Sequence, residues 1–524
     1  MKILLKPFKE NLWLFLVLYL LASSAQVYFY IHDARWLEAA DYACRGFLLS
    51  WCLAFICGLF QGKPMKMLET IFITLGVLNL ALDKGTYNIC HTPVSLDTVG
   101  LIFGTNSCEI SEFFKTYVTL PVVIFIVLVL VACALCILFK GKLTTLSKYL
   151  VWPLGVVGVG SLLFLSCCRL PKNENEISRW ESVFLCKASL FARYEKTPDL
   201  DPYRHDLLVS TSGPQPDNIV LVIGESLAKS HCSLYGYGRE TQPRLRQLGD
   251  SLIVFSDAKS AWYNTVPSIK MMLSEWDDSE GGGNWYEAVT LFDVAKAAGY
   301  RTEWISNQSS AGIADNPVAA YASLADTTIW LGQRGVGKQK QDYDGIVVEK
   351  FRDRLGEVST GCKTLYIIHL MGCHESFAQR YPAMETCFEA DDYQELPENQ
   401  RLAISQYDNA VRYNDAVMGE LLDLISNTES VLLYLPDHGL DLYVSSPDYY
   451  GHARMGDDVS VAEGVKVPMI MYMSSAYRER FPSDCQFWTI RSTEAFNSKN
   501  LIPLCCDLMK IDSFSQSTEN NSTI

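Results

Sequence analysis

The stretch NIVLVIGES, residues 218–226, decides the fold of the second part of the chain. Its first seven residues form a continuous apolar run, which is typical of a strand buried on both faces of a sheet. Further short apolar runs follow it at 302–306, 364–370, 431–436 and 467–473. Helical patterns at 291–300 and 407–425 lie between these runs. Strands that alternate with helices predict an α/β sheet with helices on both faces.

The carboxyl ends of the predicted strands carry polar side chains, and this is where open α/β sheets bind ligands. The residues that follow the predicted strands are Glu225, Asn307, His374, Asp437 and His438, and His452 lies further downstream. Three of the eight histidines of the chain belong to this set. Carboxylate oxygens and imidazole nitrogens bind zinc, and manganese is an alternative. Each residue alone has a structural explanation, such as a helix N-cap for Asp437. Their combination predicts a metal site.

A hydroxyl nucleophile is predicted in SAWYNTVPSIKMMLSEW, residues 260–276. Thr265 stands two residues before Pro267, which suits the first turn of a helix. A helix N-terminus favours an anion, and a metal lowers the pKa of a nearby hydroxyl, which can then attack phosphorus or sulfur. A plain N-cap is the alternative role for Thr265. Ser260 and Ser268 are rival nucleophiles.

The first third of the chain contains long apolar stretches at 11–31, 46–61, 67–82, 117–139 and 150–168. A membrane-spanning helix needs about 17–25 mostly apolar residues, so five spans are predicted. The second and third stretches are shorter, and a buried hairpin is the alternative for them. The first is expected to be a retained anchor rather than a signal peptide, because it lacks a small-residue cleavage site and further spans follow it.

Basic connections predict the orientation of these spans. Lysines precede the first span and separate the second from the third and the fourth from the fifth: Lys2, Lys6, Lys9, Lys63, Lys66, Lys140, Lys142 and Lys148. The positive-inside rule places them in the cytoplasm. Everything after about residue 170 then lies on the opposite side, which in a Gram-negative bacterium is the periplasm.

The remaining segments complete the predicted organisation. Trp180 and Phe184 could lie on one face of a helix on the membrane surface, and a linker with one packed helix is the alternative. The polar C-terminal tail is expected to be disordered. The predicted parts are a transmembrane domain at 1–170, a linker at 171–214, a catalytic domain at 215–512 and a tail at 513–524.

Composition excludes some classes of protein. Aromatic residues make up 12% and hydrophobic residues 49% of the chain, which excludes a fully disordered protein. A net charge of −15 argues against nonspecific nucleic-acid binding, because that requires a basic surface. Among the 17 cysteines, Cys90 and Cys108 are the predicted disulfide.

One segment, VIGESLAKSHCSLYGYGRETQPRL at 222–245, closely resembles the signature of bacterial phosphoethanolamine transferases, which belong to the alkaline-phosphatase/sulfatase superfamily. The resemblance continues in GYRTEWISNQ (299–308), HLMGCHESFAQRYP (369–382), YDNAVRYNDAV (407–417) and LPDHGLDL (435–442). It implies a bundle of five transmembrane helices followed by an alkaline-phosphatase/sulfatase-like α/β/α periplasmic domain.

The resemblance also implies roles for the candidate residues. One tightly bound zinc would be held by Glu225, Thr265, Asp437 and His438, and Thr265 would also be the nucleophile. The substrate phosphate or a second zinc would be held by His374 and His452, and Asn307 would contact the substrate.

Two features depart from the family pattern. The segment SAWYNTVPS (260–268) lacks the cysteines that flank the nucleophile in lipid A-modifying members. In this respect the chain is more similar to the lipopolysaccharide-core branch of the family. Leu440 and Asp441 replace a glutamate that often follows the Asp-His-Gly motif.

The activity implied by the resemblance is transfer of phosphoethanolamine from phosphatidylethanolamine to lipopolysaccharide, at a core heptose or lipid A, through a phospho-threonine. The protein would be a monomeric, multi-pass inner-membrane enzyme that contributes to polymyxin resistance and does not bind nucleic acid. The rival interpretations are a lipoteichoic-acid-type glycerol-phosphate transferase, a sulfatase-like phosphohydrolase, and a metal-binding scaffold without activity.

Overall fold

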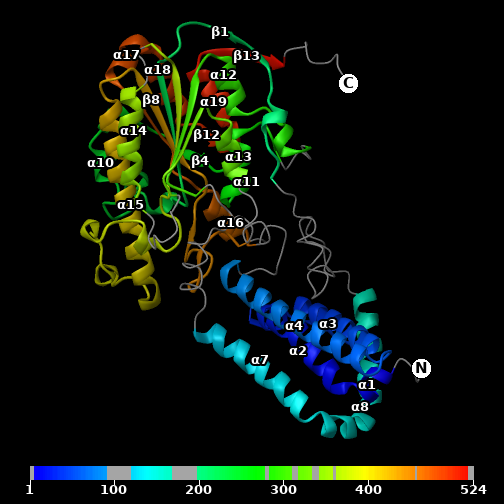
Figure 1. Cartoon of the computed structure of the whole chain (residues 1–524). Helices are drawn as coiled ribbons and strands as arrows, with labels where there is room; N and C mark the ends of the chain where they lie inside the picture. The colour runs from blue at the N-terminus through cyan, green and yellow to red at the C-terminus, as the bar shows by residue number, and fades with distance from the viewer. Residues whose placement is uncertain are drawn as a thin grey trace, which may run out of the picture. The chain divides into compact units, whose positions relative to one another are not determined.

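The computed structural model of the chain divides into two compact units (Figure 1). The membrane unit comprises Met1–Thr105 and Glu109–Glu195, and the sheet unit comprises Asn106–Cys108 and Lys196–Ile524. The structure describes residues 5–32, 34–90, 120–167, 197–277, 283–309, 317–332, 342–357, 361–454 and 457–516. The predicted surface helix with Trp180 and Phe184, and the Cys90–Cys108 pair, lie outside the residues whose side chains are described.

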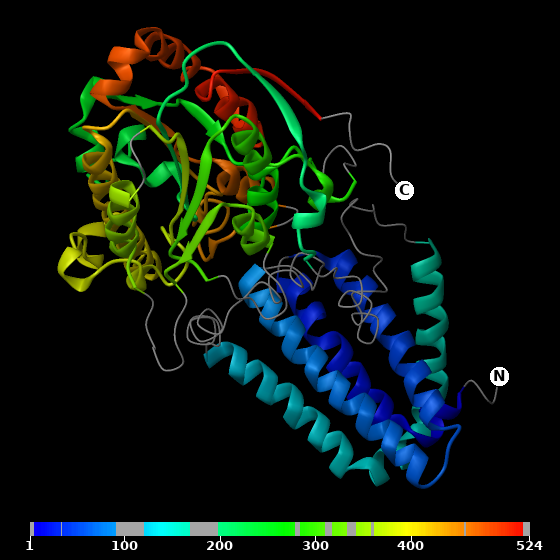
Figure 2. The ribbon, with the colours of Figure 1, turned by 45° about the horizontal axis from the view of Figure 1, so that its top comes forward.

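Five helices of the membrane unit are long and apolar enough to cross a membrane. They are α2 (Leu12–His32), α3 (Trp36–Cys57), α4 (Lys63–Cys90), α7 (Leu120–Leu138) and α8 (Lys140–Cys167), and a short helix α1 (Lys6–Glu10) precedes them. Figure 2 shows α2, α3 and α4 side by side. The five predicted spans are therefore confirmed as helices of sufficient length.

The helices α3 and α4 are longer than the apolar stretches that predicted them. The predicted stretches stop next to charged residues, at Arg45 in α3 and at Asp83 in α4, but the helices continue through both. Burial of their polar groups between helices makes this continuation possible: Asp83, for example, accepts a hydrogen bond from Gln26 Nε2 at 3.2 Å. The basic connection 140–149 is helical as well, since α8 begins at Lys140.

A seven-stranded sheet forms the centre of the sheet unit, in the order β3-β11-β8-β2-β7-β5-β6. Its strands are β2 (Asn218–Gly224), β3 (Leu252–Val254), β5 (Arg301–Ser306), β6 (Thr327–Trp330), β7 (Thr364–His369), β8 (Ser430–Pro436) and β11 (Ile470–Met473). All neighbours pair in parallel except β11, which is antiparallel to β3 and β8. This mostly parallel core confirms the predicted α/β sheet.

Helices cover both faces of this sheet (Figure 1). One face packs against α14 (Gly345–Glu357) and α15 (Glu398–Ile425). The other packs against α11 (Thr265–Leu273), α12 (Leu291–Ala297), α13 (Pro317–Ser323) and α19 (Leu501–Leu508). Alternate residues of the central strand β2 contribute to the two cores, Leu221 to one and Val222 to the other, so this strand is buried on both sides as its apolar run predicts.

The ends of the sheet unit differ from the sequence-based boundaries. Strand β1 (Leu207–Thr211), placed in the predicted linker, pairs antiparallel with β13 (Ile511–Gln516), which includes the first residues of the predicted tail. Both were missed because they are mixed in polarity: β13 buries Ile511 and exposes Asp512 and Ser513. The rest of the predicted tail, 517–524, lies outside the described residues.

Asp408 on α15 ties the 222–245 segment to the helical layer. Its fully buried carboxylate lies 2.7 Å from His231 Nδ1 and accepts hydrogen bonds from the hydroxyls of Tyr237 at 2.7 Å and Tyr393 at 2.5 Å. Removing the carboxylate would leave these three groups without their partner, and buried polar groups without partners are costly.

We expect Asp408→Ala to lower the free energy of unfolding by roughly 3–5 kcal/mol and the thermal midpoint of the full chain by about 5–15 °C. Asp423→Ala is the matched control on the same helix, because Asp423 forms an exposed pair with Arg244 at 2.8 Å, a type of contact worth at most about 1 kcal/mol. Equal midpoints for the two variants in a thermal melt would contradict this role of Asp408.

Candidate active site

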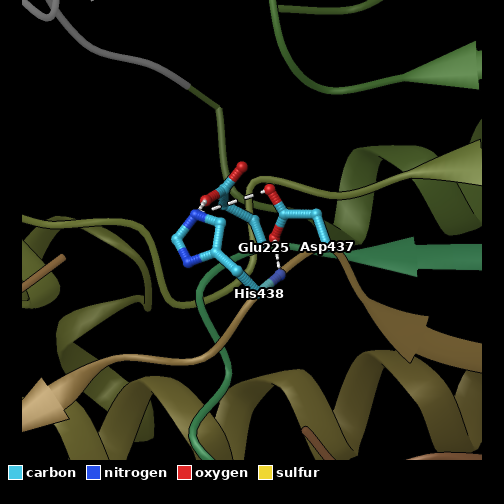
Figure 3. Close-up of side chains that lie close together, drawn as sticks. All are labelled: Glu225, Asp437 and His438. Atoms are coloured by element: carbon cyan, nitrogen blue, oxygen red, sulfur yellow. Dashed lines mark hydrogen bonds and ion pairs between the residues drawn. The ribbon is translucent and has the colours of Figure 1, made fainter. Parts of the chain in front are cut away.

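Two adjacent parallel strands bring the candidate metal ligands together. Gly224 at the end of β2 pairs with Pro436 at the end of β8, so Glu225 and the residues Asp437 and His438 leave the sheet at the same level. One ligand atom from each of the three lies within 4.8 Å of the others, and all three side chains are buried (Figure 3). The structure thus brings together three of the four predicted metal ligands as one cluster.

The turn after β2 holds the two carboxylates in place. Ser226 donates its hydroxyl to Glu225 Oε1 at 2.6 Å and its backbone N–H to Asp437 Oδ1 at 3.1 Å. Its φ of +55° lies in the left-handed region, which costs energy for a residue with a side chain. The hydroxyl of Tyr407 offsets part of that cost by donating to the Ser226 carbonyl at 2.8 Å. Backbone strain at this turn places a donor beside each carboxylate.

The backbone also orients the imidazole of His438. Its Nδ1 lies 2.7 Å from the carbonyl oxygen of Gly439, which can only accept, so Nδ1 carries the proton. Nε2, which lies 3.4 Å from Glu225 Oε1, is then the nitrogen whose lone pair becomes available when the ring is neutral (Figure 3). A carbonyl behind the ring is the arrangement that fixes metal-binding histidines in proteins.

Thr265 brings a second hydroxyl, besides that of Ser226, to this cluster. It is the first residue of α11, and its Oγ1 lies 3.3 Å from His438 Nε2 and 3.4 Å from Glu225 Oε2. The N-cap of α11 is Asn264, so the N-cap alternative for Thr265 is wrong. The predicted rivals Ser260 and Ser268 are buried and both donate to the carbonyl of Trp262, at 2.6 and 2.8 Å.

The electrostatics of the cluster favour a cation. Burial and the nearby charge of Glu225 raise the pKa of Asp437 to about 7. Burial alone would lower the pKa of His438, but Asp437 and Glu225 outweigh it and raise the pKa to about 9. Burial would likewise raise the pKa of Glu225, but its contact with His438 holds that pKa well below the usual range. Asp437 and His438 therefore retain protons that a cation can displace, whereas Glu225 stays ionised.

The donor set fits a divalent cation such as zinc. Among the described residues, no donor forms a hydrogen bond to Asp437 Oδ2, although this oxygen is buried. A buried carboxylate oxygen without a donor is costly, and a metal would supply the missing partner. Glu225, Asp437, His438 and Thr265 offer oxygen and nitrogen atoms, which zinc accepts.

A residue missed in the sequence, Gln308, contacts the cluster. Its Nε2 donates to Glu225 Oε2 at 3.0 Å and to the Leu370 carbonyl at 3.1 Å. The signal was available, because Gln308 follows the predicted strand at 302–306 directly after Asn307. Asn307 itself donates to Asp344 Oδ1 at 2.8 Å and to the Asp342 carbonyl at 2.9 Å. Its predicted substrate contact stays a prediction.

The loop that carries His374 is fixed by Asp344. The Asp344 carboxylate accepts the N–H groups of Met371 at 2.9 Å and Gly372 at 2.8 Å. Gly372 has a φ of +51°, and a Cβ there would lie 2.8 Å from the backbone nitrogen and oxygen of Glu225, so only glycine fits. The buried Nδ1 of His374 has no hydrogen-bond partner within the described part of the chain. It remains available for a ligand.

His452 is placed near the cluster by a second loop. Its ring centre lies 4.8 Å from that of His438, and its Nδ1 lies 3.5 Å from Glu375 Oε1. The short strands β9 (Asp441–Leu442) and β10 (Tyr450–Gly451) pair antiparallel just before His452. Asp441, the departure from the family pattern, is fully buried and accepts from the hydroxyl of Ser460 at 2.6 Å. The phosphate-binding or second-zinc role of the two histidines stays a prediction.

Comparison with known proteins places the sheet unit in a described family. The sulfatase family model matches residues 217–511. The phosphoethanolamine transferase EptC of Escherichia coli strain K12 is 28% identical over 283 residues, which cover 52% of this chain and 48% of that protein. The chain therefore spans about half the length of this curated relative.

Two solved structures are similar to the chain. A crystal structure of the C-terminal periplasmic domain of EptC from Escherichia coli, in complex with zinc, matches with a TM-score of 0.51 and 26% identity, covering 59% of this chain and 87% of that one. The integral membrane lipooligosaccharide phosphoethanolamine transferase A from Neisseria meningitidis matches with a TM-score of 0.67 over 96% of both chains. Because it is 18% identical, this second match shows a shared fold, membrane helices included.

We expect the full chain to copurify with a divalent cation that is lost in Asp437→Ala and His438→Ala. Loss of one ligand should weaken metal binding by about 100-fold or more, because changes to groups outside the ligand shell already cost 10–100-fold. Elemental analysis after purification with equal zinc and manganese would measure content and identity together. His205→Ala, which removes an imidazole that contacts the Glu287 carbonyl, should keep its metal. Full metal content in the two ligand variants would exclude this site.

Metal affinity should rise with pH between about 6 and 9. The pKa values of Asp437 (about 7) and His438 (about 9) are raised in the metal-free protein, so each group holds a proton below its pKa that the metal must displace. Each displaced proton adds roughly a tenfold gain in affinity per pH unit. Competition with a chelator of known pH dependence would measure how metal affinity changes with pH. Asp437→Asn should flatten this affinity profile near pH 7. A flat wild-type profile would contradict the coupling.

Proposed function

Since the chain belongs to the sulfatase family, we propose that it is a zinc-dependent transferase that moves phosphoethanolamine from phosphatidylethanolamine to lipopolysaccharide through phospho-Thr265. One observation carries the proposal: the Thr265 hydroxyl, at the N-terminus of a helix, lies 3.3–3.4 Å from a buried cluster of two carboxylates and an imidazole. A nucleophile beside a metal site suits phosphoryl transfer.

The comparisons support the choice of transferred group. EptC of Escherichia coli carries the name phosphoethanolamine transferase, and the structure of its periplasmic domain includes zinc. The Neisseria protein with the same fold along almost the whole chain is named a lipooligosaccharide phosphoethanolamine transferase. The five long apolar helices agree with this substrate class, because both donor and acceptor lipids stay in the bilayer.

In the proposed first step, the side chains position and activate Thr265. Its Oγ1 attacks the phosphorus of phosphatidylethanolamine, the phosphorus–oxygen bond to the glycerol breaks, and diacylglycerol leaves after taking up a proton. His374 and His452 bind the phosphate oxygens. The first N–H groups of α11 favour the negative charge that develops at Thr265. Zinc, when bound, would polarise the hydroxyl and neutralise part of the phosphoryl charge.

In the second step, the acceptor restores Thr265. A hydroxyl or phosphate oxygen of lipopolysaccharide, on a core heptose or lipid A, attacks the phosphorus, and the Thr265 oxygen leaves with a proton. The missing cysteines around Thr265 favour the core acceptor. The enzyme would act in the periplasm as a monomer of the inner membrane, and the added ammonium groups would offset surface charge and so reduce binding of polymyxin. A second zinc ion could bind beside the first, and manganese is the alternative to zinc.

We predict a phosphoethanolamine adduct on the peptide 260–276 after the zinc-loaded full chain is incubated with phosphatidylethanolamine. Thr265→Ala should abolish the adduct and lower diacylglycerol release at least about a thousandfold, because the other described hydroxyl at the cluster, that of Ser226, is fully buried and donates to Glu225 Oε1. Thr489→Ala, which removes an exposed threonine of α18 (Pro482–Arg491), should leave both unchanged.

Peptide mass spectrometry with a diacylglycerol assay distinguishes the alternatives. A glycerol-phosphate adduct formed from phosphatidylglycerol instead would establish the lipoteichoic-acid-type transferase. Free phosphoethanolamine released without an acceptor would establish a phosphohydrolase. Bound zinc with neither adduct nor diacylglycerol would leave the scaffold interpretation.

A further inference from the structure

The buried charged and amide side chains that the structure describes in the membrane unit gather in one half of the helix bundle. They lie toward the end of α2, the start of α3 and the end of α4: Gln26, Asp41, Asn79, Asp83 and Lys84. The predicted orientation places this half in the periplasmic leaflet. Ionisable residues inside a membrane are costly and mark functional positions unless they are paired.

The two buried carboxylates of this group are paired within the bundle. Asp41 receives two hydrogen bonds from Arg45, at 2.6 and 3.0 Å. Asp83 receives hydrogen bonds from the amides of Gln26 at 3.2 Å and Asn79 at 3.0 Å. These contacts explain why both carboxylates are tolerated, and they leave one buried ionisable group to explain.

In the part of the chain that the structure describes, Lys84 is a buried cation that no carboxylate contacts. Lys84 is only 5% exposed. Its Nζ lies 4.7, 4.8 and 5.1 Å from the ring centres of Tyr28, Tyr87 and Phe125. Three rings stabilise the charge, but their faces offer no lone pairs to three N–H donors. Neighbouring Asp83 accepts hydrogen bonds from the amides of Gln26 and Asn79.

The position of Lys84 corresponds to the level of lipid headgroups. Aromatic rings of α2, α3 and α4 contact one another at the same end of the bundle, with centre distances of 4.3 Å for Phe29 and Tyr87 and 5.0 Å for Tyr30 and Tyr42. Such aromatic groups are enriched where a membrane meets water. Tyr28, one wall of the Lys84 cage, is 43% exposed, so the cage borders the surrounding lipid.

We propose that Lys84, enclosed by Tyr28, Tyr87 and Phe125, binds the phosphate of a phospholipid in the periplasmic leaflet. An anion is the ligand that the buried ammonium lacks, and three N–H donors match phosphate oxygens. A lipid phosphate reaches this depth as part of the bilayer, whereas free phosphate would have to leave water. The identity of the lipid as phosphatidylethanolamine rests on the proposed function, for which this site would hold the donor lipid before reaction.

The test measures lipid binding and not turnover. The delipidated full chain in detergent, carrying Thr265→Ala to prevent reaction, is titrated with phosphatidylethanolamine, phosphatidylglycerol, diacylglycerol or inorganic phosphate, and bound lipid is counted by native mass spectrometry. Lys84→Met should weaken binding of both phospholipids about tenfold or more, the effect of one charge-assisted hydrogen bond. Lys84→Arg should restore it. Lys148→Met is the matched control, because Lys148 is an exposed lysine with its Nζ 4.9 Å from the ring of Tyr149.

Unchanged phospholipid binding in Lys84→Met, or equal losses for diacylglycerol, would overturn the proposal. Displacement of the lipid by millimolar inorganic phosphate would overturn the lipid source and leave a free-anion site. Where Lys84→Met does not fold, a phospholipid with a photoreactive headgroup is crosslinked to the chain carrying native Lys84. Crosslinks to residues 79–90 support the site, and crosslinks confined to other segments overturn it. Failure of the Thr265 adduct experiment would not change either readout, so the two proposals fail separately.

Discussion

The structure of the sheet unit depends on the close approach of two buried carboxylates, Glu225 and Asp437. The parallel pairing of β2 with β8 brings them to one level, where they would repel each other without compensation. Ser226, Gln308 and His438 each direct a polar group at one of them. The strain at Ser226 is the cost of this arrangement, and among the described residues Asp437 Oδ2 accepts no hydrogen bond, its nearest cationic partner being His438 Nε2 at 3.6 Å.

Loops outside the cluster extend the same arrangement to the histidines. Asn307 supports Asp344, and Asp344 fixes the Gly372 turn against the backbone of Glu225. Asp441 fixes the segment that leads to His452 by accepting the backbone N–H groups of Val444 and Ser445. In this way buried acids that touch no reacting atom determine where the imidazoles lie, which is the role that groups behind a ligand shell have in metal sites. The proposed phosphoryl transfer needs this rigidity, because its rate depends on holding the nucleophile and the phosphate in the reactive geometry.

The membrane unit handles buried charge in a different way. Asp41 and Asp83 are neutralised or hydrogen-bonded by neighbours on the helices, whereas Lys84 contacts only aromatic rings among the described residues. Each unit thus contains a buried ionic group for which we propose a ligand, a cation in the sheet unit and an anion in the membrane unit. A protein that transfers a charged headgroup of a lipid would require both kinds of ligand.

Much of this protein was predictable from local sequence patterns. Apolar runs determined the five spans and the strands β2, β5, β7 and β8, because hydrophobic burial depends on composition over short windows. The ligand candidates Glu225, Asp437 and His438 followed from their places at strand ends. Mixed-polarity elements such as β1 and β13 gave no such signal, since their pairing joins residues about 300 positions apart.

Tertiary structure alone decided which side chains meet. It placed the Thr265 hydroxyl at the cluster and directed those of Ser260 and Ser268 to the Trp262 carbonyl, and it turned Asn307 toward Asp344 and brought Gln308 to Glu225. It also carried α3 and α4 past Arg45 and Asp83, where the apolar pattern ends. The physical reason is the same in each case: a hydrogen bond or ion pair depends on distances of about 3 Å between groups far apart in the chain, and these are set only when the elements pack.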